Sequence, residues 1–240
     1  MSAFFYSVAV QWKMDIRSKA LLITCYVVPL LFFALMGSIF TSINPQMAES
    51  LIPSMTVMGV SMGALIGLPP SIVALYGGDC KKMYQANGVP LYLGLVSMFL
   101  SAFIHLLIMS AILYLVAPAA FGAAVPQNPL SYFGALAIFL AASLSVGCLL
   151  GLIMKNQAKL TMVAQLVFLP SILLSGILFP ADLLPQALIH VGKIFPATWG
   201  YQLMLDGGFS LENLWPLISV LLIMLGACGL LLHRMKARGN

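Results

Sequence analysis

The chain has 240 residues, of which 62% are hydrophobic and 7% are charged, and its formal net charge is +5. About 25% of the residues of an average soluble domain are charged, so this chain has too few polar side chains to cover a water-soluble globule. The composition excludes an ordinary soluble enzyme, and it excludes an intrinsically disordered protein, which needs the opposite balance. Because the surplus apolar surface must contact lipid, we expect an all-α polytopic membrane protein.

The N-terminal segment has an amphipathic pattern. Large apolar residues, including Trp12 and Ile16, recur at helical spacing over residues 3–19, and the charged residues, including the Asp15–Lys19 pair, occupy other faces. This pattern predicts an amphipathic interfacial helix on the inner membrane surface, with Trp12 at the depth of the lipid headgroups. A simple surface anchor with no further role is equally compatible with the pattern.

Long stretches without Asp, Glu, Lys or Arg define the membrane spans. Four of these stretches are long enough for one helix of about 20 residues each. A fifth, 83–154, holds two helices, since its residues 117–130 contain three prolines and are typical of a loop. We therefore predict a single domain over 1–240 with six transmembrane helices, near residues 20–41, 52–76, 91–116, 131–153, 160–180 and 213–233.

The segment between the second and third spans, GGDCKKMYQANGVP, is the most polar connecting loop on its side of the membrane. It is long enough for a short helix, which Asn87, Gly88 and Pro90 would end. Asp79 would lie near the start of this helix, where a carboxylate interacts favourably with the helix dipole. A solvated connector whose lysines only set the topology is the alternative.

Small residues form faces on two of the spans. Gly59, Gly63 and Gly67 recur every four residues in the second span, a spacing that lets helices approach closely in lipid. A similar face on the fourth span consists of Ser143, Gly147 and Gly151. Packing within one subunit and packing between subunits are both compatible with this pattern.

Prolines interrupt two of the spans. Pro69 and Pro70 lie in the second span and Pro170 lies in the fifth, where kinks or unwound turns are expected. Backbone groups that such breaks expose are tolerated only against protein or a wet cavity. The two breaks therefore favour positions that face protein or an aqueous path.

His105 is the only ionisable residue expected deep in the membrane, and it lies on the third span. Ionisable residues at such depth are candidate functional sites, and a proton or ion role is one interpretation. A structural role is the other, because a neutral imidazole near Ser101 and Ser110 can be satisfied by a hydrogen bond between helices. Gln165 on the fifth span is the other polar residue that we expect to be buried.

The segment after the fifth span, 181–211, is too polar and too interrupted to cross the bilayer. Apolar residues on one helical face predict a short helix near 185–194 in the outer interface. Pro196, Gly200 and Gly207-Gly208 are expected to break the chain into a second piece. We therefore expect short re-entrant or interfacial external helices between spans five and six.

The positions of the basic residues predict the orientation, since cytoplasmic loops are enriched in Lys and Arg. Ten of the eleven basic residues lie on one side of the predicted spans, and Lys193 lies on the other. The ten are Lys13, Arg17, Lys19, Lys81, Lys82, Lys155, Lys159, Arg234, Lys236 and Arg238. Both termini are therefore expected in the cytoplasm, and the net charge reflects membrane topology instead of a nucleic-acid partner.

The sequence contains no catalytic or metal-binding pattern. The four cysteines are isolated, without metal-ligand or redox spacing, and His, Asp and Glu residues do not converge as an intramembrane enzyme would need. A Gly-x-x-x-x-Gly-Lys-Ser/Thr phosphate loop is also missing. We expect the chain to bind no metal or cofactor of its own and not to be an enzyme by itself.

The stretch 168–204 contains four short motifs in order. They are Leu174-Ser175-Gly176, Phe179-Pro180, Leu184-Pro185 and Pro196-Ala197-Thr198-Trp199-Gly200-Tyr201. In the context of the predicted spans, this order resembles the signature of ABC-2 type permeases, the membrane subunits of ABC exporters. The resemblance covers nearly the whole chain as one ABC-2 type transmembrane domain, although the loop over 77–90 has fewer charges than is common in the family.

The resemblance implies an arrangement of subunits. Permeases of this kind pair with a second permease, the same or related, and bind two copies of a separate ATP-binding cassette subunit, which holds ATP and Mg²⁺. The N-terminal helix and the loop helix would be the elements that contact this subunit. The coupling residues implied are Asp79, Lys81, Lys82, Tyr84 and Gln85, and the second and fifth helices would border the translocation path.

The resemblance therefore implies a multi-pass permease in the lipid of the cell membrane that serves an ATP-driven exporter. A pathway without charges favours a hydrophobic or amphipathic cargo, such as a drug, an antibiotic peptide or a lipid-like molecule, as in efflux and antibiotic resistance. The alternative function is a channel or a proton-coupled carrier that uses His105.

Overall fold

The computed structural model describes residues 3–43, 45–178, 183–205 and 210–237. These ranges form helices joined by short connections, and they contain no strand. The α-helices are α1 (Ala3–Arg17), α2 (Lys19–Leu22), α3 (Val28–Ile43), α4 (Leu51–Met62), α5 (Leu68–Gly77), α6 (Asp79–Ala86), α7 (Leu91–Phe121), α8 (Pro129–Ile153), α9 (Gln157–Leu173), α10 (Gln186–Gly192), α11 (Pro196–Leu205) and α12 (Leu211–Ala237). The chain also forms two π-helical segments, η1 (Ile23–Val27) and η3 (Gly63–Gly67), and one 3-10 helix, η2 (Pro45–Ser50).

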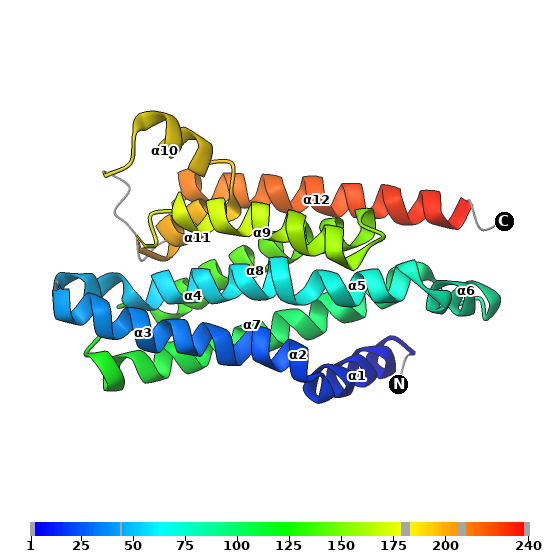
Figure 1. Cartoon of the computed structure of the whole chain (residues 1–240), viewed down its shortest axis with the longest axis horizontal. Coiled ribbons are helices and arrows are strands. Elements are labelled where there is room, and N and C mark those ends of the chain that lie inside the picture. The colour runs from blue at the N-terminus through cyan, green and yellow to red at the C-terminus, as the bar shows by residue number, and fades with distance from the viewer. Residues whose placement is uncertain (1–2, 44, 179–182, 206–209, 238–240) are drawn as a thin grey trace.

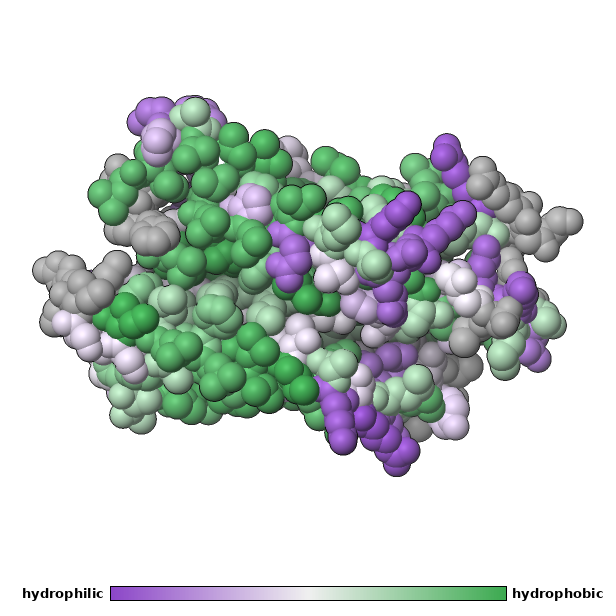
Figure 2. Space-filling view, viewed as in Figure 1, coloured by the Kyte–Doolittle hydropathy of each residue, from purple (hydrophilic) through white to green (hydrophobic). Residues whose placement is uncertain are grey.

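The long helices lie side by side as a bundle (Figure 1). α1, α6 and the C-terminal end of α12 lie at one end of the bundle, whereas α10 lies at the other. Hydrophilic side chains gather toward the first end, and apolar side chains cover most of the remaining face in view (Figure 2). The prediction of an all-α polytopic membrane protein is confirmed.

Among the described residues, five helical segments are long and apolar enough to cross a membrane: Lys19–Ser42, Ala48–Gly77, Leu91–Phe121, Pro129–Ile153 and Leu211–Met235. The predicted fifth span is a shorter apolar helix, α9, of 17 residues. α9 ends at Leu173 instead of near residue 180, because a turn follows in which Gly176 has a φ of +85°. At 1.5 Å per residue α9 is about 26 Å long, close to the roughly 30 Å of a hydrocarbon core.

The third long helix extends beyond its predicted end, since residues 117–121 continue α7 instead of beginning a loop. Pro118 lies in the last turn of this helix, where its missing N–H removes only one hydrogen bond. Gly122 then ends the helix with a φ of +63°, and its N–H donates to the Pro118 carbonyl at 3.0 Å. A glycine in the left-handed region is a common helix end.

The segment after α9 forms α10, near the short helix predicted at 185–194, and α11. The prediction that a second piece begins at Pro196 is confirmed, whereas Gly200 does not break the chain, and Gly207 and Gly208 lie outside the described residues. Pro196 is the first residue of α11, a favoured position for proline, and Gly200 lies inside α11 directly against Phe139 of α8. Because α11 packs against α4, α8, α9 and α12, it enters the bundle instead of lying on its surface.

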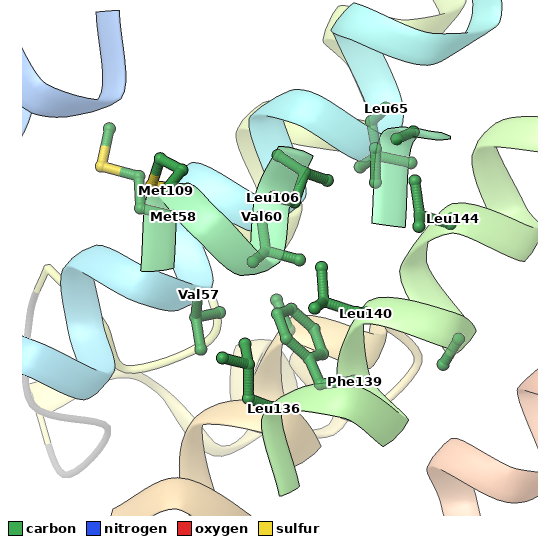
Figure 3. Packing of buried hydrophobic residues seen from close by; sticks show 14 of the residues in the cluster. Val57, Met58, Val60, Leu65, Leu106, Met109, Leu136, Phe139, Leu140 and Leu144 are labelled. Atoms are coloured by element: carbon green, nitrogen blue, oxygen red, sulfur yellow. The ribbon is translucent and has the colours of Figure 1, made fainter. Parts of the chain in front are cut away.

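The core is built around α8, which packs against α5, α7, α11 and α12. Figure 3 shows Leu136, Phe139 and Leu140 of α8 beside Val57 and Val60 of α4, and all five side chains are fully buried. Side chains of α7 complete the same cluster. This cluster holds α4, α7 and α8 together, and α7 in turn is the helix against which α1 packs.

Candidate partner-contact site

α6 joins the second and third spans at the end of the bundle where α1 also lies (Figure 1). It begins at Asp79, directly after Gly78, whose backbone is extended. At its other end the Asn87 side-chain amide donates to the Met83 carbonyl at 2.8 Å, and Gly88 has a φ of +66°. The polar loop therefore folds as a short helix between two glycines.

The residues of α6 predicted to couple to a partner differ in exposure. Lys82 is exposed, and Lys81 is half-buried. Met83, which follows them, is 63% exposed. The outward side of α6 thus combines a basic residue with an apolar one, and Met83 was not selected from the sequence because a single methionine carries no spacing signal.

Tyr84 lies on the opposite side of α6. Its ring packs against the hydrophobic core, and its carbonyl accepts a hydrogen bond from the Val89 N–H at 2.9 Å. These contacts attach α6 to the start of α7. The side chains of Asp79 and Gln85, the other predicted coupling residues, lie outside the described part of the structure.

α1 packs against α7, and Trp12 faces that helix. The prediction placed Trp12 among lipid headgroups, but its ring stacks on His105 with a centroid distance of 4.0 Å and an interplanar angle of 11°. Ile16 points elsewhere and is 46% exposed. The two residues predicted to share one apolar face therefore have different surroundings.

Along the contact between α1 and α7, a stripe of polar residues on one helix packs against a stripe of polar residues on the other. Each stripe has a four-residue spacing, which places its members on one helical face. They consist of Ser7, Gln11 and Asp15 on α1 and of Ser97, Ser101 and His105 on α7. The Ser7 and Ser97 hydroxyl oxygens are 2.9 Å apart, and the Ser101 hydroxyl donates a short hydrogen bond to Oδ2 of Asp15.

Asp15, which the prediction placed with Lys19 away from the apolar face, is only 6% exposed. Its second carboxyl oxygen, Oδ1, accepts a hydrogen bond from the Gln11 amide at 2.8 Å. Burying a carboxyl group is costly unless its oxygens have hydrogen-bond partners, and here both oxygens have one. A buried carboxyl with two defined donors fixes the register of α1 on α7.

His105 lies at the far end of the same contact and is 2% exposed. Its Nδ1 is 2.8 Å from the hydroxyl of Tyr26, which belongs to η1 of the first span. Its Nε2 is buried without a hydrogen-bond partner among the described residues. His105 therefore joins α1, the first span and the third span at one point.

We call this set of contacting residues the α1–α7 seam. It consists of Ser7, Gln11, Trp12, Asp15, Tyr26, Ser97, Ser101 and His105. From the sequence we considered a hydrogen bond for His105 near Ser101, but a contact of either residue with α1 was not predicted. The signal that could have connected them is the matching four-residue spacing of polar residues in two separate helices.

The glycines of the second span face other helices of the same chain. A side chain at Gly59 would meet Met109 of α7, one at Gly63 would meet Leu106 of α7, and one at Gly67 would meet Cys25 of η1. These contacts favour packing within one subunit over packing between subunits.

The prolines do not unwind the spans. Pro69 and Pro70 occupy the first turn of α5, directly after the π-helical segment η3, and Pro170 lies within α9. Helix two continues through this point as one helical segment from Ala48 to Gly77. The irregularity of helix two is a π-segment at Gly63–Gly67 instead of an unwound turn.

Gln165 is exposed, so the expectation that it is buried is wrong for the isolated chain. Its neighbours on α9 are Met162, 68% exposed, and Leu166, 71% exposed. The polar amide therefore lies within an apolar outer face of α9, together with the exposed Thr161. Sequence pattern could not distinguish this outer face from an inner one, because α9 has apolar residues on all sides.

Two cavities lie away from the α1–α7 seam. One of about 20 Å³, room for about one water molecule, lies where the second, fourth and fifth helices meet α11 and is lined in part by Ser61, Ser143 and Ser171. The other, of about 490 Å³, is an open cavity lined in part by Glu49 and Gln127. Within the described ranges, no three or more His, Cys, Asp or Glu residues are grouped so as to hold a metal ion.

The helix bundle with its long apolar segments is that of a membrane-embedded protein. The family model described as ABC-2 type transporter matches residues 2–209. The chain therefore belongs to this family, as its sequence motifs predicted, and it is a membrane subunit of an ABC transporter. Among curated proteins, none matches the chain.

Proposed function

We propose that the chain is the transmembrane permease of an ATP-driven exporter and that a separate ATP-binding cassette subunit, present in two copies, powers it. The observation that carries this proposal is the position of α1 and α6 together at one end of the bundle (Figure 1). Both helices are joined to α7, so a partner bound there could act on the membrane helices. ATP and Mg²⁺ would be held by the partner.

The distribution of charge supports a cytoplasmic location for this end and for both termini in a cell membrane. Hydrophilic side chains gather there (Figure 2), and the basic residues predicted for the cytoplasmic side include Lys82 of α6 and Arg17 of α1. Basic residues are retained on the cytoplasmic side of membranes. The exposed Met83 beside Lys82 offers an apolar contact that a protein partner could cover.

The outer face of α9 supports a second permease, the same or related, as a further partner. Gln165 and Thr161 are exposed there among apolar neighbours. The Thr161 hydroxyl already donates to the Gln157 carbonyl at 3.0 Å within α9. A side-chain amide that faces lipid lacks hydrogen-bond partners, whereas such amides commonly join membrane helices to one another. A second permease could satisfy Gln165 and border a path with α9.

The apolar character of the bundle supports a hydrophobic or amphipathic cargo that moves outward, such as a drug, an antibiotic peptide or a lipid-like molecule. The exposed side chains of α9 and α12 include large apolar ones such as Leu166, Trp215 and Leu222. Such surfaces favour cargo that enters from the lipid. The alternative of a channel or proton-coupled carrier depended on His105, whose contacts with Trp12 and Tyr26 favour a role in joining helices.

Copurification with the ATP-binding subunit and assays of ATP hydrolysis test this proposal. We expect the permease alone to hydrolyse no ATP, since it has no phosphate-binding loop, and the reconstituted complex to hydrolyse ATP at a rate that cargo increases. ATP hydrolysis by a preparation free of other subunits would contradict the proposal. Failure of every ATP-binding subunit tested to copurify with the permease would also contradict it.

A further inference from the structure

A helix on a membrane surface is expected to turn its apolar side inward and to expose its polar side, whereas α1 has the opposite orientation. Its polar stripe faces α7, while large apolar side chains such as Phe5, Tyr6 and Met14 are 65%, 73% and 60% exposed. Apolar contact with lipid can hold such a helix at the membrane, but it does not select a position along α7. The directed contacts of the seam do select one, because each hydrogen bond requires a particular pair of residues.

The same segment of α7 also contacts α6. The Tyr84 hydroxyl of α6 is 3.7 Å from the position where a side chain at Gly94 of α7 would begin, and the Tyr76 hydroxyl of α5 donates to the Leu91 carbonyl at the start of α7. The seam then covers α7 from Ser97 to His105. Both helices that the proposed function assigns to the ATP-binding partner are thus attached to the first half of α7.

From His105 the contacts continue into the neighbouring spans. Tyr26 belongs to the π-helical segment η1, which packs against the other π-helical segment, η3. Cys25 of η1 lies beside Gly67 of η3. π-segments interrupt the regular hydrogen bonding of a helix and are frequent at functional sites. A movement of α1 would therefore reach the irregular parts of the first and second spans through His105.

We propose that Asp15 and His105 are positioning residues that hold α1 and α7 together as one unit, through which movement of the ATP-binding partner reaches the membrane helices. This inference rests on the proposed function, because it requires a partner that acts on α1. In this proposal the buried carboxyl group of Asp15 stabilises one defined register of α1 along α7, in addition to the attachment of α1 to the membrane. Neither residue would touch ATP or cargo.

The first part of the test needs no partner. In a variant without native cysteines, Ser7→Cys with Ser97→Cys should form a disulfide on oxidation, because the two native hydroxyl oxygens are 2.9 Å apart. Ser7→Cys with Val96→Cys is the matched control, and it should not form a disulfide, since Val96 lies on another face of α7. Adding Asp15→Leu should slow cross-linking by about tenfold, whereas Asp15→Asn, which keeps an acceptor oxygen, should retain most of the rate.

The second part measures ATP hydrolysis by the complex of permease and ATP-binding subunit in lipid nanodiscs. With the cysteine pair reduced, Asp15→Leu should lower the stimulation of hydrolysis by the permease about tenfold while the subunits still copurify. Oxidation of the Ser7→Cys and Ser97→Cys pair in the same variant should restore stimulation, because the disulfide replaces the seam. His105→Ala provides a second variant with the same expected behaviour if Asp15→Leu does not fold.

The outcomes separate this inference from the proposed function. Loss of stimulation that the disulfide restores supports the inference. Unchanged stimulation despite slower cross-linking, or unchanged cross-linking in both Asp15→Leu and His105→Ala, overturns it and leaves the proposed function intact. Loss that the disulfide does not restore also overturns it. If the parent permease binds no ATP-binding subunit, the proposed function fails, and this inference fails with it.

Discussion

Gly147 shows how closely two spans of this protein approach each other at the scale of single residues. The position where its side chain would begin is occupied by the carbonyl of Ala64, a backbone atom of η3. Gly151, one turn further along α8, lies in the same way against Ile72. Small residues at this spacing let the fourth span pack directly on the irregular part of the second span.

Gly147→Ala should therefore destabilise the folded permease. The added methyl group would overlap a carbonyl that cannot rotate away, and overpacking of this kind costs about 1–3 kcal/mol. Gly226→Ala on α12 is the matched control, because no atom lies within 4 Å of the position where its methyl group would be placed. Thermal unfolding in detergent should show a lower midpoint for Gly147→Ala and an unchanged or higher one for Gly226→Ala, and equal midpoints would contradict this close contact.

Trp12 and Ile16 should respond differently to substitution by serine. Trp12→Ser removes a ring stacked on His105, which is worth about 0.5–1.5 kcal/mol in addition to the buried area, whereas Ile16→Ser changes an exposed side chain. We expect a clear decrease in thermal stability and weaker assembly with the partner for the first variant only. Equal losses in both variants would show that lipid contact, and not the α1–α7 seam, holds α1.

At the scale of elements, α6 is a short helix with one side that packs on the rest of the bundle and one side that is exposed. Tyr84 attaches it to the core, and the exposed Lys82 and Met83 lie on the outward side. The helix is fixed at both ends, by Gly78 before it and by the turn at Gly88 after it. A partner that contacts the outward side would consequently act on both α5 and α7.

Lys81→Ala with Lys82→Ala should lower cargo-stimulated ATP hydrolysis while the fold is preserved. If the two lysines lie at the rim of the contact, each ion pair that they form with the partner should contribute about 1 kcal/mol or less. The loss of stimulated ATP hydrolysis should then become smaller as salt is added. The control is Lys155→Ala with Lys159→Ala, which removes the same charge from the connection between α8 and α9 and from the first turn of α9, on the side predicted to be cytoplasmic as well. Stimulation that stays equal to the parent at every salt concentration would mean that α6 is a connector.

For the whole molecule, the arrangement of the two ends of the bundle predicts its orientation in the membrane. α6 and both described ends of the chain lie at one end and α10 lies at the other (Figure 1). With basic residues retained in the cytoplasm, α10 should be outside.

In intact cells that express variants without native cysteines, a membrane-impermeant maleimide should label Leu188→Cys of α10 and not Lys82→Cys of α6. Leu188 is 40% exposed, so the reagent can reach it. Labelling of both positions after the cells are opened serves as the control. Labelling of position 82 alone in intact cells would reverse the proposed topology.

Much of the fold could be predicted from the sequence because its signals are local. Runs without charge marked the long apolar helices, and motifs such as Leu174-Ser175-Gly176 indicated the family that the comparison confirmed. The errors also have local causes. Pro118 and Gly200 were taken as breaks, although proline is tolerated in the last turn of a helix and Gly200 lies inside α11 against Phe139.

The sequence by itself determined that this protein is an all-helical membrane protein of the ABC-2 type, because hydrophobic length and charge position depend on each segment alone. Only the tertiary structure decided which polar residues meet. Ser7 and Ser97 are 90 positions apart, and Asp15 and Ser101 are 86 apart, so their pairing depends on how α1 docks on α7. The outward position of Gln165 was likewise decided by packing, since a helix with apolar residues on every side does not specify which side faces the core.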